Sequence, residues 1–305
     1  MHFLPTSEQL ELQRGVRDVL QSAFPLDRLE AGWNASLWQV LTETGVFSLR
    51  TELELGLVEA VLVFEELGRA CVPGPLVGSF LLAGDDVGPV TVLDADRRPL
   101  LVPHLDVAHS VLVLAGESSS LVAAADVTGQ PVPQPLDPLT PLTELAAVPV
   151  GSSYGDLRAL RREGALLTAG LQLGLAARMT ELAVDYARSR QQFGRVIGSF
   201  QAVKHICADM FVRTELARAA VHAAAVTLHE PDVGDVTRAV AGAKLLADEA
   251  ATGNARACVQ VHGGMGFTWE VPVHYFVKRA WVQATEFGTG DDHADTVASC
   301  LVGAP

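Results

Sequence analysis

Long helical segments dominate the second half of this 305-residue chain, and their length constrains the fold more than any other feature. After Tyr154, alanine- and leucine-rich text with apolar residues at helical spacing predicts helices near 157–189, 199–229 and 232–262, and a shorter one from about 270. A helix of roughly 30 residues is about 45 Å long. Helices of this length, joined by short breaks, favour an antiparallel four-helix bundle over residues 151–305.

The first half of the chain divides into two regions of different character. Apolar residues recur at helical spacing from Ser7 to about Gly84, which predicts an N-terminal helical domain over residues 1–84. Short β-branched runs between Gly, Pro and Asp then predict a small β-domain over residues 85–150. The chain is therefore expected to be mainly α, with a small β middle domain between two helical ones.

Charge and cysteine usage exclude several classes of function. The 36 acidic and 22 basic residues give a net charge of −14, which argues against non-specific binding of nucleic acid. The four cysteines form no C-x-x-C pair, so neither a zinc knuckle nor a redox dithiol is indicated. The start of the chain lacks the pattern of a signal peptide, and no apolar run is long enough to span a bilayer. We expect a cytoplasmic protein with no membrane partner.

A basic, amide-rich break, RSRQQFGRVIGSFQAVKH, interrupts the predicted helices at residues 188–205. In one interpretation, Arg188, Arg190 and Arg195 are cations that offset the negative end of a helix, and Gly194 stops that helix. In the other, the arginines form an anion site, because a guanidinium offers a planar fork of donors to phosphate oxygens. The break alone does not decide between these two interpretations.

A second break, QVHGGMGF, contains Gln260, Gly263 and Gly264. Paired glycines let backbone amides approach a ligand that a Cβ atom would repel. Together with the arginines of the first break, this pattern predicts a site for a nucleotide pyrophosphate and its adenosine.

The two breaks also carry a resemblance to a known family. The order R-x-x-F-G, then I-x-x-F-Q-A-V-K and A-D-M, then Q-x-x-G-G-x-G-F about seventy residues after the arginine, resembles the C-terminal bundle of acyl-CoA dehydrogenases. The resemblance extends through VFEELGRACVPGPLVGS and covers most of the chain except the middle segment. It implies the three-domain fold of that family, FAD held at a subunit interface, and an acyl-CoA thioester as the substrate.

The resemblance also implies roles for individual residues in binding FAD that is seated mainly in a neighbouring subunit. Arg190 and Gln192 would meet the pyrophosphate, and Phe193 would pack beside the dinucleotide. Phe200 and Gln201 would lie close to it, whereas the adenosine end would be lined by Gln260, Gly263 and Gly264. No metal is expected.

Two features of the family are missing from this sequence. Residues 85–150 contain neither the Thr-Glu-Pro and Gly-Ser-Asp stretches nor the Trp-Ile-Thr-like strand that hold the flavin ring in the family. The catalytic glutamate of the family's Glu-Gly-Thr triplet is replaced by Phe287, with Glu286 one residue earlier. The alternative position of that base, on the first bundle helix, aligns with Gly164, beside Glu163.

Glu286 and Glu163 are therefore weak candidates for a base, because a shift of one residue rotates a side chain by about 100° around a helix. The alternative for both is a solvated surface carboxylate. Nearby, Asp291, Asp292, His293 and Asp295 admit a metal site, but a helix N-terminus with capping acids is the favoured interpretation.

This pattern is similar to the smaller subunits of heteromeric acyl-CoA dehydrogenases, which pair with a larger, base-bearing subunit as α2β2 assemblies. In actinobacteria many of these act on CoA thioesters of steroid side chains. Two alternatives stay open at this point. The resemblance favours such a smaller subunit; the first alternative is a self-sufficient homo-oligomeric dehydrogenase that uses Glu286, and the second is a non-redox scaffold that keeps the bundle only for packing.

Overall fold

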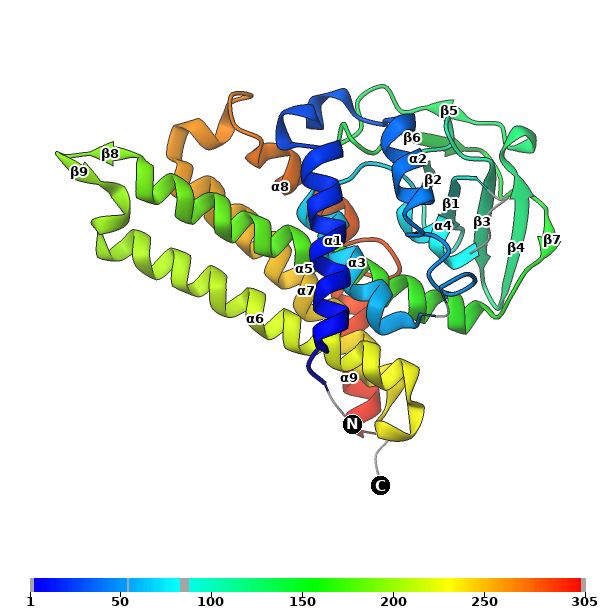
Figure 1. The fold of residues 1–305 in the computed structure, drawn as a ribbon. Coiled ribbons are helices and arrows are strands. Elements are labelled where there is room, and N and C mark those ends of the chain that lie inside the picture. Colours follow the sequence, from blue (N-terminus) through cyan, green and yellow to red (C-terminus); the bar gives the residue numbers. More distant parts are fainter. Residues whose placement is uncertain (1–2, 54, 83–87, 303–305) are drawn as a thin grey trace.

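Helices from both halves of the chain pack together beside a small β region in the computed structural model, which describes residues 3–53, 55–82 and 88–302 (Figure 1). The mainly α fold class with few strands is confirmed. The boundary predicted between residues 84 and 85 lies outside the described residues. Within the described residues, no helix is long and apolar enough to cross a membrane.

The N-terminal region is built around one buried helix. Its helices are α1 (Ser7–Ala23), η1 (Leu26–Ala31), α2 (Ala35–Glu43), α3 (Leu57–Arg69) and α4 (Leu76–Leu82). Helix α3 is buried along most of its length and packs against α1, α5 and α6. Glycines permit its closest contact with α5: a Cβ atom on Gly68 would lie 2.0 Å from the carbonyl oxygen of Leu171. The first half of α5 is thereby fixed against the N-terminal helices.

The β region contains two small sheets. The first has the strand order β1 (Val90–Asp94), β3 (Ser110–Ala115), β4 (Ser118–Ala123), β7 (Ser152–Ser153), and the second the order β2 (Leu100–Pro103), β6 (Leu142–Leu145), β5 (Gln130–Pro131). Strands β1 and β3 are parallel, and the other pairs are antiparallel. Alternate apolar side chains, among them Leu93, Val102 and Val111, form a separate small core.

The C-terminal region is a helical bundle, as predicted, but among the described residues it contains five helices rather than four. Its helices are α5 (Leu157–Ser189), α6 (Gln201–His229), α7 (Val236–His262), α8 (Val273–Gln283) and α9 (Gly290–Val302). Helix α7 begins four residues later than predicted, because the carboxylate of Asp235 accepts a hydrogen bond from the backbone N–H of Arg238 at 3.0 Å and caps the helix there. Helices α5 and α7 end at the same end of the bundle (Figure 1).

A buried arginine joins the regions. Arg279 of α8 donates to Asp137 Oδ2 at 2.5 Å, to the carbonyl of Val72 at 2.9 Å and to the carbonyl of Leu139 at 3.1 Å. Burial opposes charge on Asp137, but the Arg279 guanidinium holds the pKa of that carboxyl below its ordinary value. The ion pair therefore ties α8 to the turn after α3 and to the loop between β5 and β6.

Candidate functional site

A short hairpin projects from the end of α5. Its strands are β8 (Gln191–Gln192) and β9 (Arg195–Val196), and its two tip residues, Phe193 and Gly194, both have positive φ angles of 52° and 77°. Positive φ at both central residues is typical of tight hairpin turns, but it is unusual for phenylalanine. The Phe193 side chain is 91% exposed. The hairpin therefore holds an aromatic ring outward on a strained backbone, a feature often found at functional sites.

The polar groups of the hairpin are largely free of internal partners. Arg190 is the C-cap of α5, and among the described residues no hydrogen bond or ion pair engages its exposed guanidinium. Gln192 donates only to the neighbouring carbonyl of Gln191, at 2.8 Å. Arg195 instead stacks on the Phe200 ring, 4.1 Å from its centroid. The C-cap position of Arg190 agrees with the interpretation as a helix-end cation. The guanidinium donors of Arg190, unpaired among the described residues, are also available to a ligand.

The second break lies beside the hairpin at the same end of the bundle. Tyr186, in the last turn of α5, stacks on His262, the last residue of α7, with ring centroids 4.2 Å apart. Gln260 is exposed, and Gly263 begins η5 (Gly263–Phe267) with a φ of 59°. The structure therefore brings together the two breaks that the sequence singles out.

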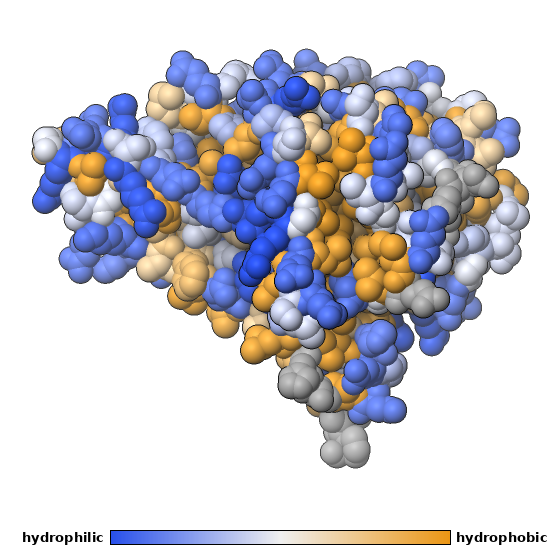
Figure 2. All heavy atoms as spheres, viewed as in Figure 1, coloured by the Kyte–Doolittle hydropathy of each residue, from blue (hydrophilic) through white to orange (hydrophobic). Residues whose placement is uncertain are grey.

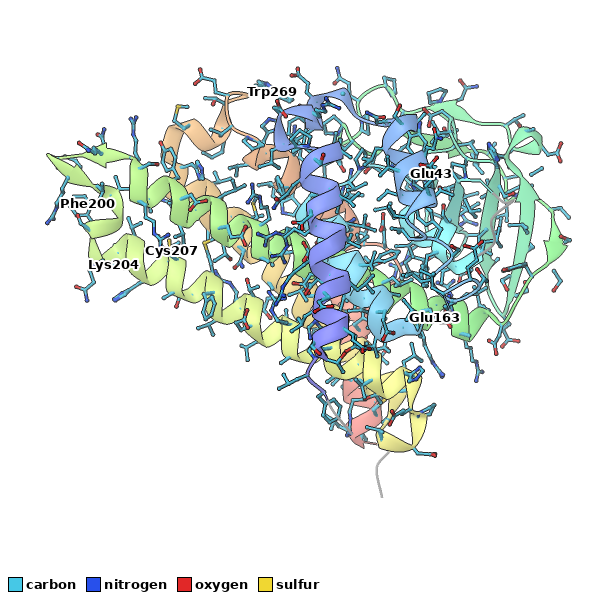
Figure 3. The ribbon with its side chains drawn as sticks, in the orientation of Figure 1. Glu43, Glu163, Phe200, Lys204, Cys207 and Trp269 are labelled. Atoms are coloured by element: carbon cyan, nitrogen blue, oxygen red, sulfur yellow. The ribbon has the colours of Figure 1, made fainter. Side chains whose placement is uncertain are left out.

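This end of the bundle fits an anionic dinucleotide that approaches from outside. Cβ atoms on Gly263 and Gly264 would meet nothing within 4 Å, so the backbone is open to a neighbour there. Helix α6 begins at Gln201 with no side-chain cap, and free N–H groups at a helix N-terminus attract anions. Figure 3 locates Phe200 and Lys204 beside the hairpin, and the surface there is mainly hydrophilic with an isolated hydrophobic patch (Figure 2). The residues present suit a pyrophosphate and a purine.

The two alternative positions of the family's base face each other at the opposite end of α5. A Cβ atom on Gly164 would lie 2.1 Å from Cε1 of Phe287, so the phenyl ring already fills the space that a side chain at 164 would need. Phe287 has a φ of 55°, and its carbonyl accepts a hydrogen bond from Nε2 of His293 at 3.1 Å. Neither position carries a carboxylate.

Glu163 points to a different partner. Its carboxylate forms an ion pair with Arg50 at 2.8 Å, and both side chains are half-buried. The Arg50 guanidinium also lies over the Phe80 ring, 4.8 Å from its centroid. The expectation of a solvated surface carboxylate was wrong here, because Arg50 comes from a distant segment that sequence spacing does not link to Glu163.

Glu286 is half-buried rather than freely solvated, which corrects the same expectation. Burial raises the pKa of its carboxyl, and the positive charges of Arg279 and Lys244 oppose that rise. Lys244 is fully buried and pairs with Asp248 at 2.5 Å. The sequence hinted at this pair, since Lys244 falls among core positions of α7 and Asp248 follows one turn later.

The acidic residues after Phe287 form a helix start. Asp292 Oδ2 accepts hydrogen bonds from the backbone N–H and the hydroxyl of Thr289, at 2.7 and 2.6 Å, and pairs with Arg97. These bonds lower the pKa of Asp292 below its ordinary value. The capping interpretation is confirmed for Asp292. Across the described ranges, no three His, Cys, Asp or Glu side chains are arranged to hold a metal ion.

Comparisons with known proteins identify one family. A family model described as "Acyl-CoA dehydrogenase, C-terminal domain" matches residues 159–301. The protein named acyl-CoA dehydrogenase IpdE2 of Mycolicibacterium smegmatis is 34% identical over 278 residues, which cover 85% of this chain and 86% of the relative.

Two solved structures have the same fold. The ChsE4-ChsE5 complex from Mycobacterium tuberculosis gives a TM-score of 0.83 at 22% identity and covers 100% of both chains. A structure described as a Tcur3481-Tcur3483 steroid ACAD variant gives 0.84 at 21% identity and covers 97% of this chain and 98% of its own.

Proposed function

The chain belongs to the acyl-CoA dehydrogenase family, and we propose that it is the smaller subunit of a heteromeric, FAD-dependent member that desaturates an acyl-CoA thioester between Cα and Cβ. A larger partner subunit would supply the catalytic base and the rest of the flavin site in an α2β2 assembly. The observation that carries this proposal is the Phe287 ring packed on Gly164, where the family has its base.

Free donors at the other end of α5 support the flavin role. Arg190 and Gln192 would hold the pyrophosphate of FAD seated mainly in the partner, and the open backbone at Gly263 and Gly264 would meet its adenosine. Bound FAD would accept the hydride that leaves Cβ of the substrate. This chain would therefore bind and orient the cofactor rather than move the substrate proton.

A missing base is the second support. A general base must lie within hydrogen-bonding reach of the proton that it removes, and the phenyl ring of Phe287 cannot accept one. Glu163 is engaged by Arg50 at 2.8 Å. The carboxylate that removes the α-proton would accordingly come from the larger subunit.

Exposed apolar side chains support a protein partner. On α6, Phe211, Val212 and Leu216 are each more than half exposed, and Phe193 and Trp269 lie exposed near the flavin end. Exposed apolar clusters of this kind mark protein interfaces. The four free cysteines suit a reducing, cytoplasmic compartment for the assembly.

The names of similar structures suggest the substrate class. One similar structure is described as a steroid ACAD and another as a two-protein complex. We extend both features to this chain and propose a CoA thioester of a steroid side chain as the substrate.

One observation favours a second candidate function, a self-sufficient homo-oligomer with Glu286 as base. The raised pKa of Glu286 is the kind of shift that catalytic bases show. A scaffold without redox function is less well supported, because packing alone does not require the free guanidinium of Arg190.

The test is to isolate the chain from its native host, identify co-purifying proteins by mass spectrometry, and compare the visible spectra of the chain alone and of the complex. We expect a chain with little flavin when alone and a yellow, active complex. A yellow, active homo-oligomer with near-stoichiometric flavin would reject the heteromer and favour Glu286 as base.

A further inference from the structure

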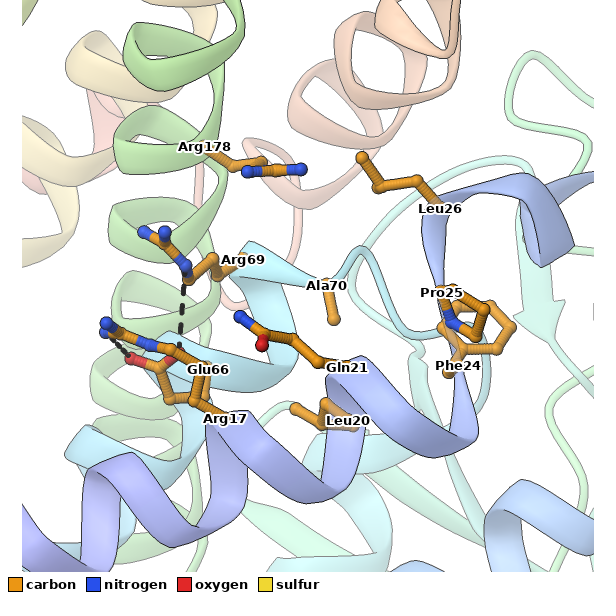
Figure 4. A pocket seen from close by; sticks show the side chains of 10 residues that line it. All are labelled: Arg17, Leu20, Gln21, Phe24, Pro25, Leu26, Glu66, Arg69, Ala70 and Arg178. Atoms are coloured by element: carbon orange, nitrogen blue, oxygen red, sulfur yellow. Dashed lines mark hydrogen bonds and ion pairs between the residues drawn. The ribbon is translucent and has the colours of Figure 1, made fainter.

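A pocket of about 300 Å³ opens between α1, the end of α3 and the middle of α5, away from both ends of α5 described above (Figure 4). Its volume falls at the lower end of the range for small-molecule sites, roughly 300–1,000 Å³. Arg178, the residue that α5 contributes, precedes Arg190 by twelve positions, or about 18 Å along the helix. The pocket is therefore separate from the flavin half-site.

The pocket has one cationic wall and one apolar wall. Arg17, Arg69 and Arg178 line the first together with the carboxylate of Glu66, which Arg17 neutralises, and the second consists of Leu20, Phe24, Pro25 and Leu26; Gln21 and Ala70 complete the lining. In Figure 4 the Arg178 guanidinium extends across the opening toward Leu26. A ligand that fills this space would touch guanidinium groups on one side and aliphatic or aromatic carbon on the other.

The three guanidiniums share two carboxylates. Arg17 donates hydrogen bonds to both carboxylate oxygens of the buried Glu66, at 2.6 and 2.8 Å. Arg69 forms an ion pair with Glu181 at 2.5 Å. Arg178 shares that same Glu181 through Nη1 at 3.0 Å, and its Nε and Nη2 donate to no protein group among the described residues. Glu65, the next acid along α3, is already engaged by Arg218. Arg178 thus offers unused donors and a share of uncompensated charge to the pocket.

We propose that this pocket binds a small apolar molecule with one anionic head group, a carboxylate, seated on Arg178. The planar fork of a guanidinium matches the two oxygens of a carboxylate, whereas a neutral head group would leave the shared charge unbalanced. The wall formed by Leu20, Phe24 and Leu26 would cover the apolar body. This site lies outside the proposed function, and its occupation does not depend on FAD or on a partner.

The test is calorimetric titration of the full chain with octanoate, with acetate and octan-1-ol as matched probes that lack the apolar body or the charge. We expect octanoate to bind at least ten-fold more tightly than either. Arg178→Gln should weaken octanoate binding about ten-fold or more, since it removes a charge-assisted hydrogen bond. Arg158→Gln, which removes an exposed arginine at the N-terminal end of α5, should change octanoate binding less than about two-fold.

Three further measurements show whether a change in binding comes from the pocket itself. Leu26→Ser should weaken octanoate and leave acetate unchanged, and thermal melts of each variant should show a folded chain. Arg178→Gln should also leave flavin retention by the complex unaltered. Equal binding of octanoate by wild type and Arg178→Gln, equal binding of octanol and octanoate, or no octanoate binding by wild type at about 10 mM would each overturn the proposal.

Discussion

The two ends of α5 differ in whether their polar and aromatic groups have partners inside the chain. At the Gly164 end, the Phe287 ring fills the available space and Glu163 is paired with Arg50. At the Arg190 end, no described residue pairs with the guanidinium, and the Phe193 ring is 91% exposed. One end is internally packed and paired, and the other presents exposed groups. Under the proposed function, this contrast separates a lost chemical role from a retained binding role on one helix.

The largest effect is expected from breaking the packed end. Gly164→Ala drives a methyl group into the Phe287 ring, 2.1 Å from Cε1, and should reduce the free energy of unfolding by about 2–3 kcal/mol. Phe287→Ala should cost about 3 kcal/mol through the lost burial. The double variant should be more stable than the sum of both losses predicts, because the added methyl group then occupies space that the ring vacated. Urea unfolding of the four proteins measures this, and strict additivity would refute the direct contact.

At the open end, Arg190→Ala should weaken FAD retention by the reconstituted complex about ten- to a hundred-fold, since a charge-assisted hydrogen bond contributes about 1.5–3 kcal/mol. Lysine at this position should rescue only part of the loss, because it keeps the charge but not the fork. The flavin content of each complex and its Kd for FAD measure this effect. Arg188→Ala is the matched control, and equal retention in wild type and Arg190→Ala would leave this arginine as a helix-end cation only.

Acid should lower the free energy of unfolding by protonating His293, which packs at the Gly164 end of α5. Burial lowers the pKa of His293 from 6.5 to about 4, so the unfolded chain binds a proton more readily than the folded one. The stabilising contribution of neutral His293 is present above pH 6.5 and is lost as the pH falls toward 4. His293→Gln keeps a donor for the Phe287 carbonyl but does not titrate, and should flatten that part of the pH profile. Urea midpoints between about pH 7 and 4 test this, and parallel profiles would exclude His293.

The smallest effect is expected from the two carboxylates. Glu286→Gln and Glu163→Gln should each leave acyl-CoA oxidation by the complex within a few fold, whereas loss of a general base typically costs about 10²–10⁴ in rate. Steady-state rates at full flavin occupancy measure this. A decrease in rate of the larger size in either variant would show that this chain carries the catalytic base. The Gly164 end of α5 would then have a chemical role as well.

Local sequence patterns predicted the structure at the Arg190 end of α5 better than the structure at the Gly164 end. The bounds 157–189 were expected and observed for α5, because a long alanine- and leucine-rich run is followed at once by the Arg190–Gly194 break. The contact of Gly164 with Phe287 joins residues more than a hundred positions apart, and the Arg50 to Glu163 pair joins different regions. Helical periodicity carries no information on such contacts. The parallel pairing of β1 with β3 could not be predicted from local sequence patterns either, since strand order depends on non-local pairing.

The positive φ angle of Phe193 has a consequence for the lifetime of the chain in a cell. A non-glycine residue in this conformation costs on the order of 1 kcal/mol or more, and an isolated copy also holds the aromatic ring in water. Phe193→Gly would relieve the strain and stabilise the lone chain while removing the ring that the proposed assembly would use. In the proposed heteromer, a copy without its partner would leave the Phe193 ring in water, whereas an assembled copy would bury it, so the lone copy would be less stable and more open to proteolysis. Degradation of unpaired copies would then favour equal numbers of the two proposed subunits.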